Sequence, residues 1–191
     1  MTLDLLDDPH PRFACVLSDP PWPERGGGQS KRGADRHYPV VPCREIPDLI
    51  RSSGLHTPAE HAHHWMWTTD NYLREALWVL ETLGWRYVRT AVWVKAGGEA
   101  ELADGAQQIG LGQYLRGSHE LLLFAVRGKG ADPSVRTEDR TRSSVIYGRR
   151  TKHSRKPETA YELIEAVSRG PRVEFFARLE RPGWVSWGNE V

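Results

Sequence analysis

The chain alternates short apolar runs with stretches in which apolar residues recur every three or four positions. Short runs rich in Val, Leu, Trp and Phe are typical of buried strands. They predict strands at 13–17, 64–68, 87–95, 121–126, 145–147, 173–177 and 185–187. The helical spacing predicts one helix from Thr69 or Asp70 to Gly84 and another from Pro157 to Gly170.

Strand and helix follow one another through short links, which predicts an α/β fold with a mostly parallel sheet. Ligands of such sheets bind at the carboxyl ends of the strands, so chemistry is expected directly after each strand. Two long loops, 23–42 and 96–117, hold many of the glycines. Loops of this length in a compact domain are usually functional or disordered.

Composition narrows the class of protein. The 191 residues suit a single domain, 1–191, and 39% hydrophobic with 27% charged residues suits a soluble globular enzyme. The sequence contains no long apolar run of the kind that spans a membrane, and its acidic start does not resemble a signal peptide. Cys15 and Cys43 lack metal-ligand spacing, so we expect a reduced, cytoplasmic protein without a metal.

Net charge is only +1, yet the basic residues are clustered. Such clusters indicate either solvated loops or a nucleic-acid face, and charge alone favours neither. They comprise Lys31, Arg32, Arg36, Arg136, Arg140, Arg142, Arg149, Arg150, Lys152, Arg155 and Lys156. A group of histidines, His61, His63 and His64, has poor spacing for a tetrahedral metal site, and we interpret it as a loop entering a strand.

Asp19-Pro20-Pro21-Trp22 follows the first predicted strand directly. An exocyclic adenine amine is a weak nucleophile because its lone pair is delocalised, and acceptors on both of its N–H groups would hold it in line for attack. A carboxylate and a backbone carbonyl can do this together, and the two prolines fix the carbonyl and remove competing donors. Trp22 offers a flat face on which an extruded base could stack. A rigid turn with a packed Trp is the alternative.

This motif resembles the catalytic motif of the DPPW-type adenine-N6 methyltransferases. That family includes the catalytic subunit of the eukaryotic messenger-RNA adenosine methyltransferase and bacterial and phage DNA methyltransferases. Further segments resemble the family in the same order over nearly the whole chain, namely Tyr38-Pro39, Trp93-Val94-Lys95, His119–Leu123, Val126–Gly128, His153–Glu158, Glu174–Arg178 and Trp184–Asn189. The resemblance implies a Rossmann-like methyltransferase fold with helices on both faces of the sheet, and a permuted order with the catalytic motif first and the cofactor strand last.

The resemblance also implies roles for individual positions. Catalysis is expected of Asp19, Pro20, Pro21 and Trp22. S-adenosylmethionine is expected to contact Asp19, Lys156, Glu174, Phe175, Arg178, Asn189 and Glu190. The acceptor is expected near Tyr38, Lys95, Glu120 and Arg149. The chain departs from many cofactor-binding methyltransferases because no Gly-x-Gly follows the strand at 173–177, where Ala177 and Arg178 stand.

The expected reaction is direct methyl transfer from S-adenosylmethionine to adenine N6 in nucleic acid, with most of the rate coming from positioning. DNA is the first choice of acceptor and RNA the second. Two other classes stay open: a non-catalytic nucleic-acid-binding partner of a methyltransferase complex, and a small-molecule amine methyltransferase. Assembly as a homodimer or a heterodimer is compatible with the sequence.

Overall fold

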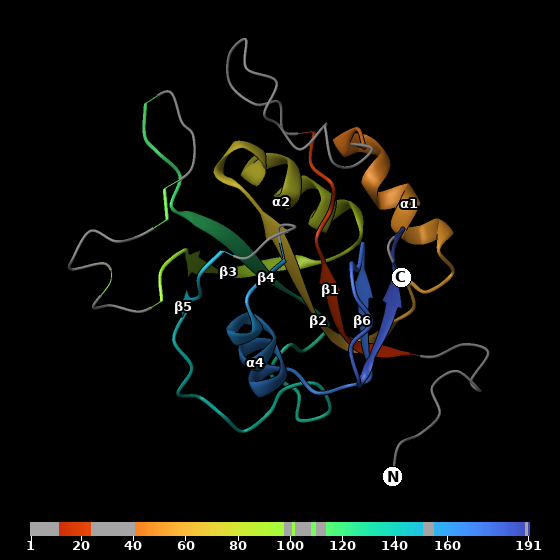
Figure 1. Ribbon diagram of the computed structural model, residues 1–191. Helices are drawn as coiled ribbons and strands as arrows, with labels where there is room; N and C mark the ends of the chain where they lie inside the picture. The colour runs from red at the N-terminus through yellow and green to blue at the C-terminus, as the bar shows by residue number, and fades with distance from the viewer. Residues whose placement is uncertain are drawn as a thin grey trace.

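A computed structural model describes residues 12–23, 41–97, 101, 108–109, 114–150, 155–189 and 191. Its strands form one seven-stranded sheet in the order β5-β3-β4-β2-β1-β6-β7 (Figure 1). They are β1 (Phe13–Ser18), β2 (Pro58–Thr68), β3 (Arg86–Val94), β4 (His119–Arg127), β5 (Val145–Tyr147), β6 (Arg172–Phe175) and β7 (Trp184–Trp187). Only β4 runs against its neighbours, because it pairs antiparallel with β2 and β3 while the remaining pairs are parallel. The predicted, mostly parallel α/β sheet is confirmed.

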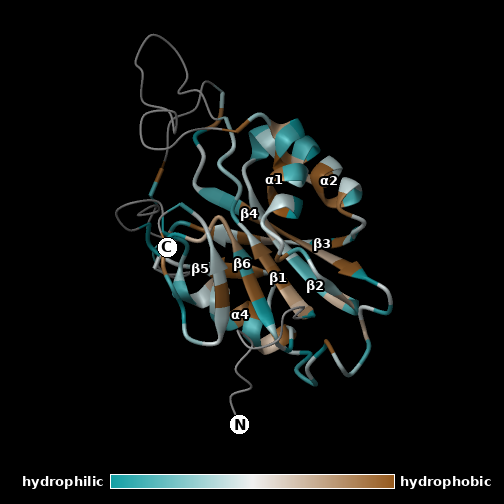
Figure 2. Cartoon of the chain, turned by 90° about the vertical axis from the view of Figure 1, so that its right-hand side faces the viewer, coloured by the Kyte–Doolittle hydropathy of each residue, from teal (hydrophilic) through white to brown (hydrophobic). Residues whose placement is uncertain are grey.

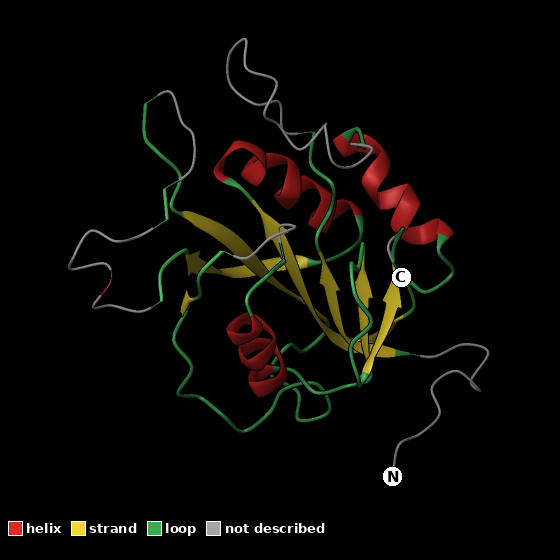
Figure 3. Cartoon of the chain, viewed as in Figure 1, coloured by secondary structure: helices red, strands yellow, loops and turns green. Residues whose placement is uncertain are grey.

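Helices cover both faces of the sheet, as expected (Figure 3). One face is covered by α1 (Ile46–Ser52) and α2 (Leu73–Thr82), and the other by α4 (Glu158–Val167). Two apolar cores follow from this layering. The first packs α1 and α2 on β1, β2, β4 and β6, and the second packs α4 on the opposite side of β1, β2 and β3. β1 carries mostly hydrophobic colour in Figure 2, and α1 and α2 show both colours, as amphipathic helices do.

Most predicted boundaries agree with the structure, and the differences have local causes. Gly84 has a φ of 84°, a conformation that glycine adopts without strain, and it ends α2 as expected. The second helix ends at Val167 rather than near Gly170, because Ser168 adopts extended backbone and bridges to Arg136. Neither Thr69 nor Asp70 caps α2 with its side chain; a 3₁₀ turn at Asp70–Tyr72 leads into that helix instead.

The histidine group does not form the expected loop entering a strand but lies within β2, where successive side chains point to opposite faces. His63 contacts Ser168 Oγ at 2.8 Å and His64 contacts Ser18 Oγ at 2.9 Å, on the two sides of the sheet. His61 lies 3.6 Å from Asp132. Within the described part of the chain, no helix has the length and apolar character that a membrane crossing needs.

Candidate active site

Charged side chains from distant parts of the sequence meet at the carboxyl edge of the parallel strands. Asp19 follows β1, Lys95 follows β3 and Arg178 lies just after β6. Because β4 is reversed, its beginning lies at this edge, and Glu120 is therefore placed beside the ends of β2 and β3. Lys156 arrives from the segment that precedes α4.

These side chains form a continuous network of opposite charges. The Lys156 ammonium lies 3.0 Å from Asp19 Oδ1 and 2.8 Å from Glu120 Oε2. The other Glu120 oxygen is 3.0 Å from Lys95 Nζ, and the other Asp19 oxygen is 3.5 Å from Arg178. Lys156 and Asp19 are only 11% exposed at their side chains, so the network is largely shielded from water. Lys156 also lies 5.1 Å from the centre of the Trp67 ring.

The network fixes the charge state of its members. Burial alone would raise the pKa of Glu120, but the ammonium groups of Lys156 and Lys95 outweigh it and lower the pKa to about 2. Burial alone would lower the pKa of Lys156, but the Asp19 and Glu120 carboxylates raise it. Glu120 and Lys156 are therefore both held in their charged forms, and charge-assisted contacts fix each of them against its neighbours.

The Asp-Pro-Pro-Trp turn is anchored on both sides. The Asp19 amide donates to Phe175 O at 3.3 Å, and the Trp22 amide donates back to Pro20 O at 2.8 Å. The Trp22 indole donates to Trp67 O at 3.0 Å, and its ring stacks on Tyr72 with centroids 5.8 Å apart. These contacts hold the backbone of the turn so that Asp19 points into the charged network.

A cavity of about 360 Å³ opens beside this network, between β6, the segment after it and the beginning of α4. Asp19, Lys156 and Arg178 line one part of it, and Tyr161, Glu174 and Arg181 line another. The volume falls in the range of pockets that hold small molecules. Its walls offer carboxylates, guanidinium groups and an aromatic ring, which suits a ligand with both charges and hydroxyl groups.

Glu174 is the most perturbed carboxyl group in this cavity. It accepts a hydrogen bond from Tyr161 OH at 2.9 Å. Burial raises the pKa of Glu174 to about 7, with a smaller contribution from the Asp19 charge and an opposing one from the Tyr161 hydrogen bond. The carboxyl group is thus poised to change charge near neutral pH.

The backbone after β6 reaches a tight conformation without the glycine that the sequence lacks there. Phe176 has a φ of 61°, in the left-handed region, and directs the chain back toward the cavity. Gly188 lies so close to this turn that a Cβ atom would be 2.2 Å from Ala177 O. A glycine is therefore required, but on the opposing β7 segment rather than after β6.

The sequence of the chain is similar to known proteins over most of its length. A family model described as MT-A70 matches residues 13–190. The chain belongs to the MT-A70 family. Its similar proteins include an N(6)-adenosine-methyltransferase MT-A70-like protein from Arabidopsis thaliana, 26% identical over 94% of this chain, and the N(6)-adenosine-methyltransferase catalytic subunit METTL3 from Homo sapiens, 24% identical over 94%. The Type II methyltransferase M.MunI from Mycoplasma sp is 25% identical over 96% of this chain and is matched over 79% of its own length.

The chain spans only about a quarter of the length of the plant relatives and of the human one. MT-A70 is an enzyme family, and the names of these relatives place adenosine-N6 methyltransferases within it. The family membership expected from Asp19-Pro20-Pro21-Trp22 is confirmed.

The structure gathers most of the residues that the MT-A70 resemblance singled out. Asp19, Lys156, Glu174 and Arg178 line one cavity, and Lys95 and Glu120 extend the network on its other side. Arg149 follows β5 and pairs with Glu101 at an exposed position. Asn189 follows β7 and is exposed, whereas Tyr38, Glu190 and most of both long loops lie outside the described residues.

Two expectations need correction. Trp22 does not present a free face to a base, because its side chain is 6% exposed and one face lies against Tyr72. Phe175 cannot reach the cofactor cavity, because it is fully buried in the core beneath α1 and α2. Its neighbour Phe176 lines the cavity instead.

Tyr161 and Arg181 also line the cavity, although the sequence analysis assigned no role to either. Tyr161 lies on α4, one turn after Pro157, and its ring is packed 3.8 Å from the Arg181 guanidinium carbon. Arg181 is held in turn by both oxygens of Glu158 at 2.6 Å. In the sequence Tyr161 stands among the apolar positions of the predicted helix, and that pattern does not distinguish a cavity residue from a core residue.

Glu174→Gln is expected to stabilise the protein at pH 8 by about 1–3 kcal/mol, the free energy of a pKa raised from 4.5 to about 7. A raised carboxyl pKa gives stability that is fully present below pH 4.5 and is lost as pH rises through about 7. The advantage of the variant should therefore disappear toward pH 5. Urea unfolding between pH 5 and pH 8 measures it, with the exposed Glu162→Gln as control. A difference that does not change with pH would contradict the assignment.

Proposed function

We propose that this chain transfers a methyl group from S-adenosylmethionine to the N6 amine of adenine in nucleic acid. Membership of the MT-A70 family supports the reaction class. The observation that carries the proposal is the position of Asp19, which lines the 360 Å³ cavity and is joined through Lys156 to Glu120 and Lys95. One carboxylate thus stands between a pocket for the methyl donor and a polar surface for the acceptor.

The residues of the cavity fit the chemistry of S-adenosylmethionine. Its carboxylate suits Lys156 or Arg178, and its ribose hydroxyls suit an acceptor such as Glu174. Asn189 and Glu190 are proposed to complete the cofactor contacts. The bound cofactor supplies an electrophilic methyl group on a sulfonium centre.

Asp19 and the Pro20 carbonyl are proposed to orient the acceptor amine. The Pro20 oxygen accepts one hydrogen bond from the Trp22 amide, and a carbonyl oxygen has a second lone pair to offer. With the cofactor bound, the amine nitrogen would take the methyl group while the neutral thioether leaves, and the surplus proton of the amine would pass to water. Trp22 contributes by holding this turn rather than by stacking on the base.

Nucleic acid is the proposed acceptor, with DNA first and RNA second. Lys95, Glu120, Arg149 and Tyr38 are proposed to contact it. An adenine in a duplex must leave the stack before the amine can reach Asp19, at a cost of a few kcal/mol, and a single strand avoids that cost. We also propose that the chain works as a dimer, either with a second copy of itself or with a different partner subunit.

Methyl transfer from labelled S-adenosylmethionine to single-stranded DNA, duplex DNA and RNA of one adenine-containing sequence tests the proposal. Label on adenine N6 in any of these acceptors is expected, and the relative rates rank them. Matched acceptors in which N6-methyladenine replaces adenine should take up no label. Labelling of small-molecule amines instead, or binding of nucleic acid without any transfer, would overturn the proposal.

A further inference from the structure

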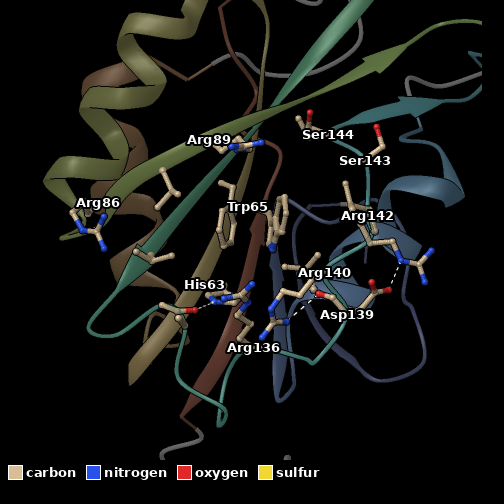
Figure 4. A pocket seen from close by; sticks show the side chains of 18 residues that line it. His63, Trp65, Arg86, Arg89, Arg136, Asp139, Arg140, Arg142, Ser143 and Ser144 are labelled. Carbon is tan, nitrogen blue, oxygen red and sulfur yellow. Dashed lines mark hydrogen bonds and ion pairs between the residues drawn. The ribbon is translucent and has the colours of Figure 1, made fainter.

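A second cavity, of about 450 Å³, lies on the face of the sheet that α4 covers (Figure 4). It shares no lining residue with the cavity beside Asp19. The two cavities lie at different parts of α4, because Tyr161 lines the first and Leu163 and Val167 line the second. Nothing in the proposed methyl transfer uses this second cavity.

Five arginines and one carboxylate line the second cavity, so its charge is strongly positive. Arg86 and Arg89 come from β3, and Arg136, Arg140 and Arg142 come from the segment that joins β4 to β5 (Figure 4). The carboxylate is Asp139, and it already accepts from the Thr141 amide at 2.8 Å and from Arg142 Nε at 2.7 Å. Among the described residues, no carboxylate pairs with Arg86, Arg89 or Arg136, which leaves their guanidinium groups available to an anion.

An irregularity in β3 brings two of these groups to the same cavity. Arg86 pairs with Val126, Tyr87 with Ala125 and Arg89 with Phe124, so Val88 is an extra residue in the ladder. Strict alternation would turn Arg86 and Arg89 to opposite faces, and the bulge restores them to one face. The arginines therefore converge because of a specific backbone feature.

The floor of the cavity is apolar and aromatic. Trp65 and Phe124 lie 4.4 Å apart, and Ala91 and Leu163 complete the surface. Both nitrogens of His63 are engaged, with Ser168 Oγ at 2.8 Å and Gly130 O at 2.7 Å. The last carbonyls of α4 are also occupied, since the Ser168 amide donates to Ile164 O and the Thr137 amide to Val167 O. The acceptors that would otherwise repel an anion here are thus already satisfied.

We propose that this cavity binds one nucleotide unit, with the guanidinium groups of Arg86, Arg89 and Arg136 on its phosphate and the base or sugar against the Phe124 side of the floor. Arginine suits phosphate because its donors form a planar fork, and an aromatic floor accepts any base without reading its sequence. The nucleotide is either free or part of a strand. A strand held here would be anchored at a distance from the catalytic edge.

Calorimetric titration with thymidine monophosphate, thymidine, inorganic phosphate and oligothymidylate tests this proposal. None of these probes carries an adenine amine, so the result is independent of whether methyl transfer occurs. Thymidine monophosphate is expected to bind more tightly than either phosphate or thymidine alone. Stronger binding of oligothymidylate would identify the strand as the source of the nucleotide.

The double variant Arg86→Gln/Arg89→Gln is expected to weaken nucleotide binding at least tenfold, and both positions are exposed, so the fold should survive. The exposed Arg74→Gln, on α2 and the opposite face of the sheet, serves as the matched control. Arg136→Gln should weaken binding through the other wall of the cavity. Equal binding by the double variant and the unsubstituted protein would overturn the proposal, as would thymidine binding as tightly as its monophosphate.

Discussion

Asp19→Asn is expected to lower methyl transfer to adenine by about 100- to 10,000-fold. This is the usual loss when a side chain that orients a reacting atom and stabilises the charge on that atom is removed. The carboxylate accepts from Lys156 at 3.0 Å and lies 3.5 Å from Arg178, and two oxygens still have room for one amine N–H. Asparagine keeps the shape but replaces one acceptor with a donor. The amine would then lose the partner that holds it in line.

The cofactor affinity of Asp19→Asn separates orientation of the acceptor from binding of the donor. We expect titration calorimetry with S-adenosylmethionine to show a change far smaller than the change in rate. The exposed Asp48→Asn, which removes a carboxylate that pairs with Arg51, should leave both measurements unaltered. Normal turnover by the Asp19 variant would disprove the mechanism. Equal losses of cofactor affinity and transfer rate would show that Asp19 acts by binding the cofactor and not by orienting the acceptor.

The sequence was sufficient to predict the layers of the fold and the side of the sheet that carries the chemistry. Asp19 stands directly after a strand and Lys156 just before a helix, where the α/β arrangement places both at one edge of the sheet. Glu174 lies inside β6, and its assignment came from the family resemblance. The reversal of β4 could not be predicted, because a strand buried on both faces shows no alternation of polar and apolar residues. That reversal is what brings Glu120 into the site.

Local geometry explains the remaining differences. Phe175 and Phe176 are identical residues in adjacent positions, and only the φ of 61° at Phe176 decides which of them reaches the cavity. The α1 helix is short, and its Pro47 near the start leaves little periodic pattern to detect. The burial of Trp22 depends on Tyr72, which lies on another element and is brought into contact only by the fold.

Lys156→Met is expected to lower the free energy of unfolding by about 3 kcal/mol and to weaken cofactor binding. The ammonium joins Asp19 and Glu120, which are 11% and 18% exposed, and its removal leaves two shielded carboxylates with fewer counter-charges. Lys95 and Arg178 remain, which keeps the loss at the lower end for a broken buried pair. For a chain of this size the midpoint of thermal unfolding should fall by roughly 6–12 °C.

A second substitution distinguishes the structural part of this loss from the functional part. Lys156→Met combined with Glu120→Gln removes one of the two carboxylates that lose the Lys156 charge, so part of the stability should return while cofactor affinity and methyl transfer stay low. Lys129→Met, at an exposed position, controls for the introduction of methionine. Urea unfolding and cofactor titration of the three variants provide the test. If Lys156→Met unfolds at the same urea concentration as the unsubstituted protein, the network does not stabilise the fold. If the double variant regains both cofactor affinity and stability, Lys156 acts through packing and not through its charge at the cofactor cavity.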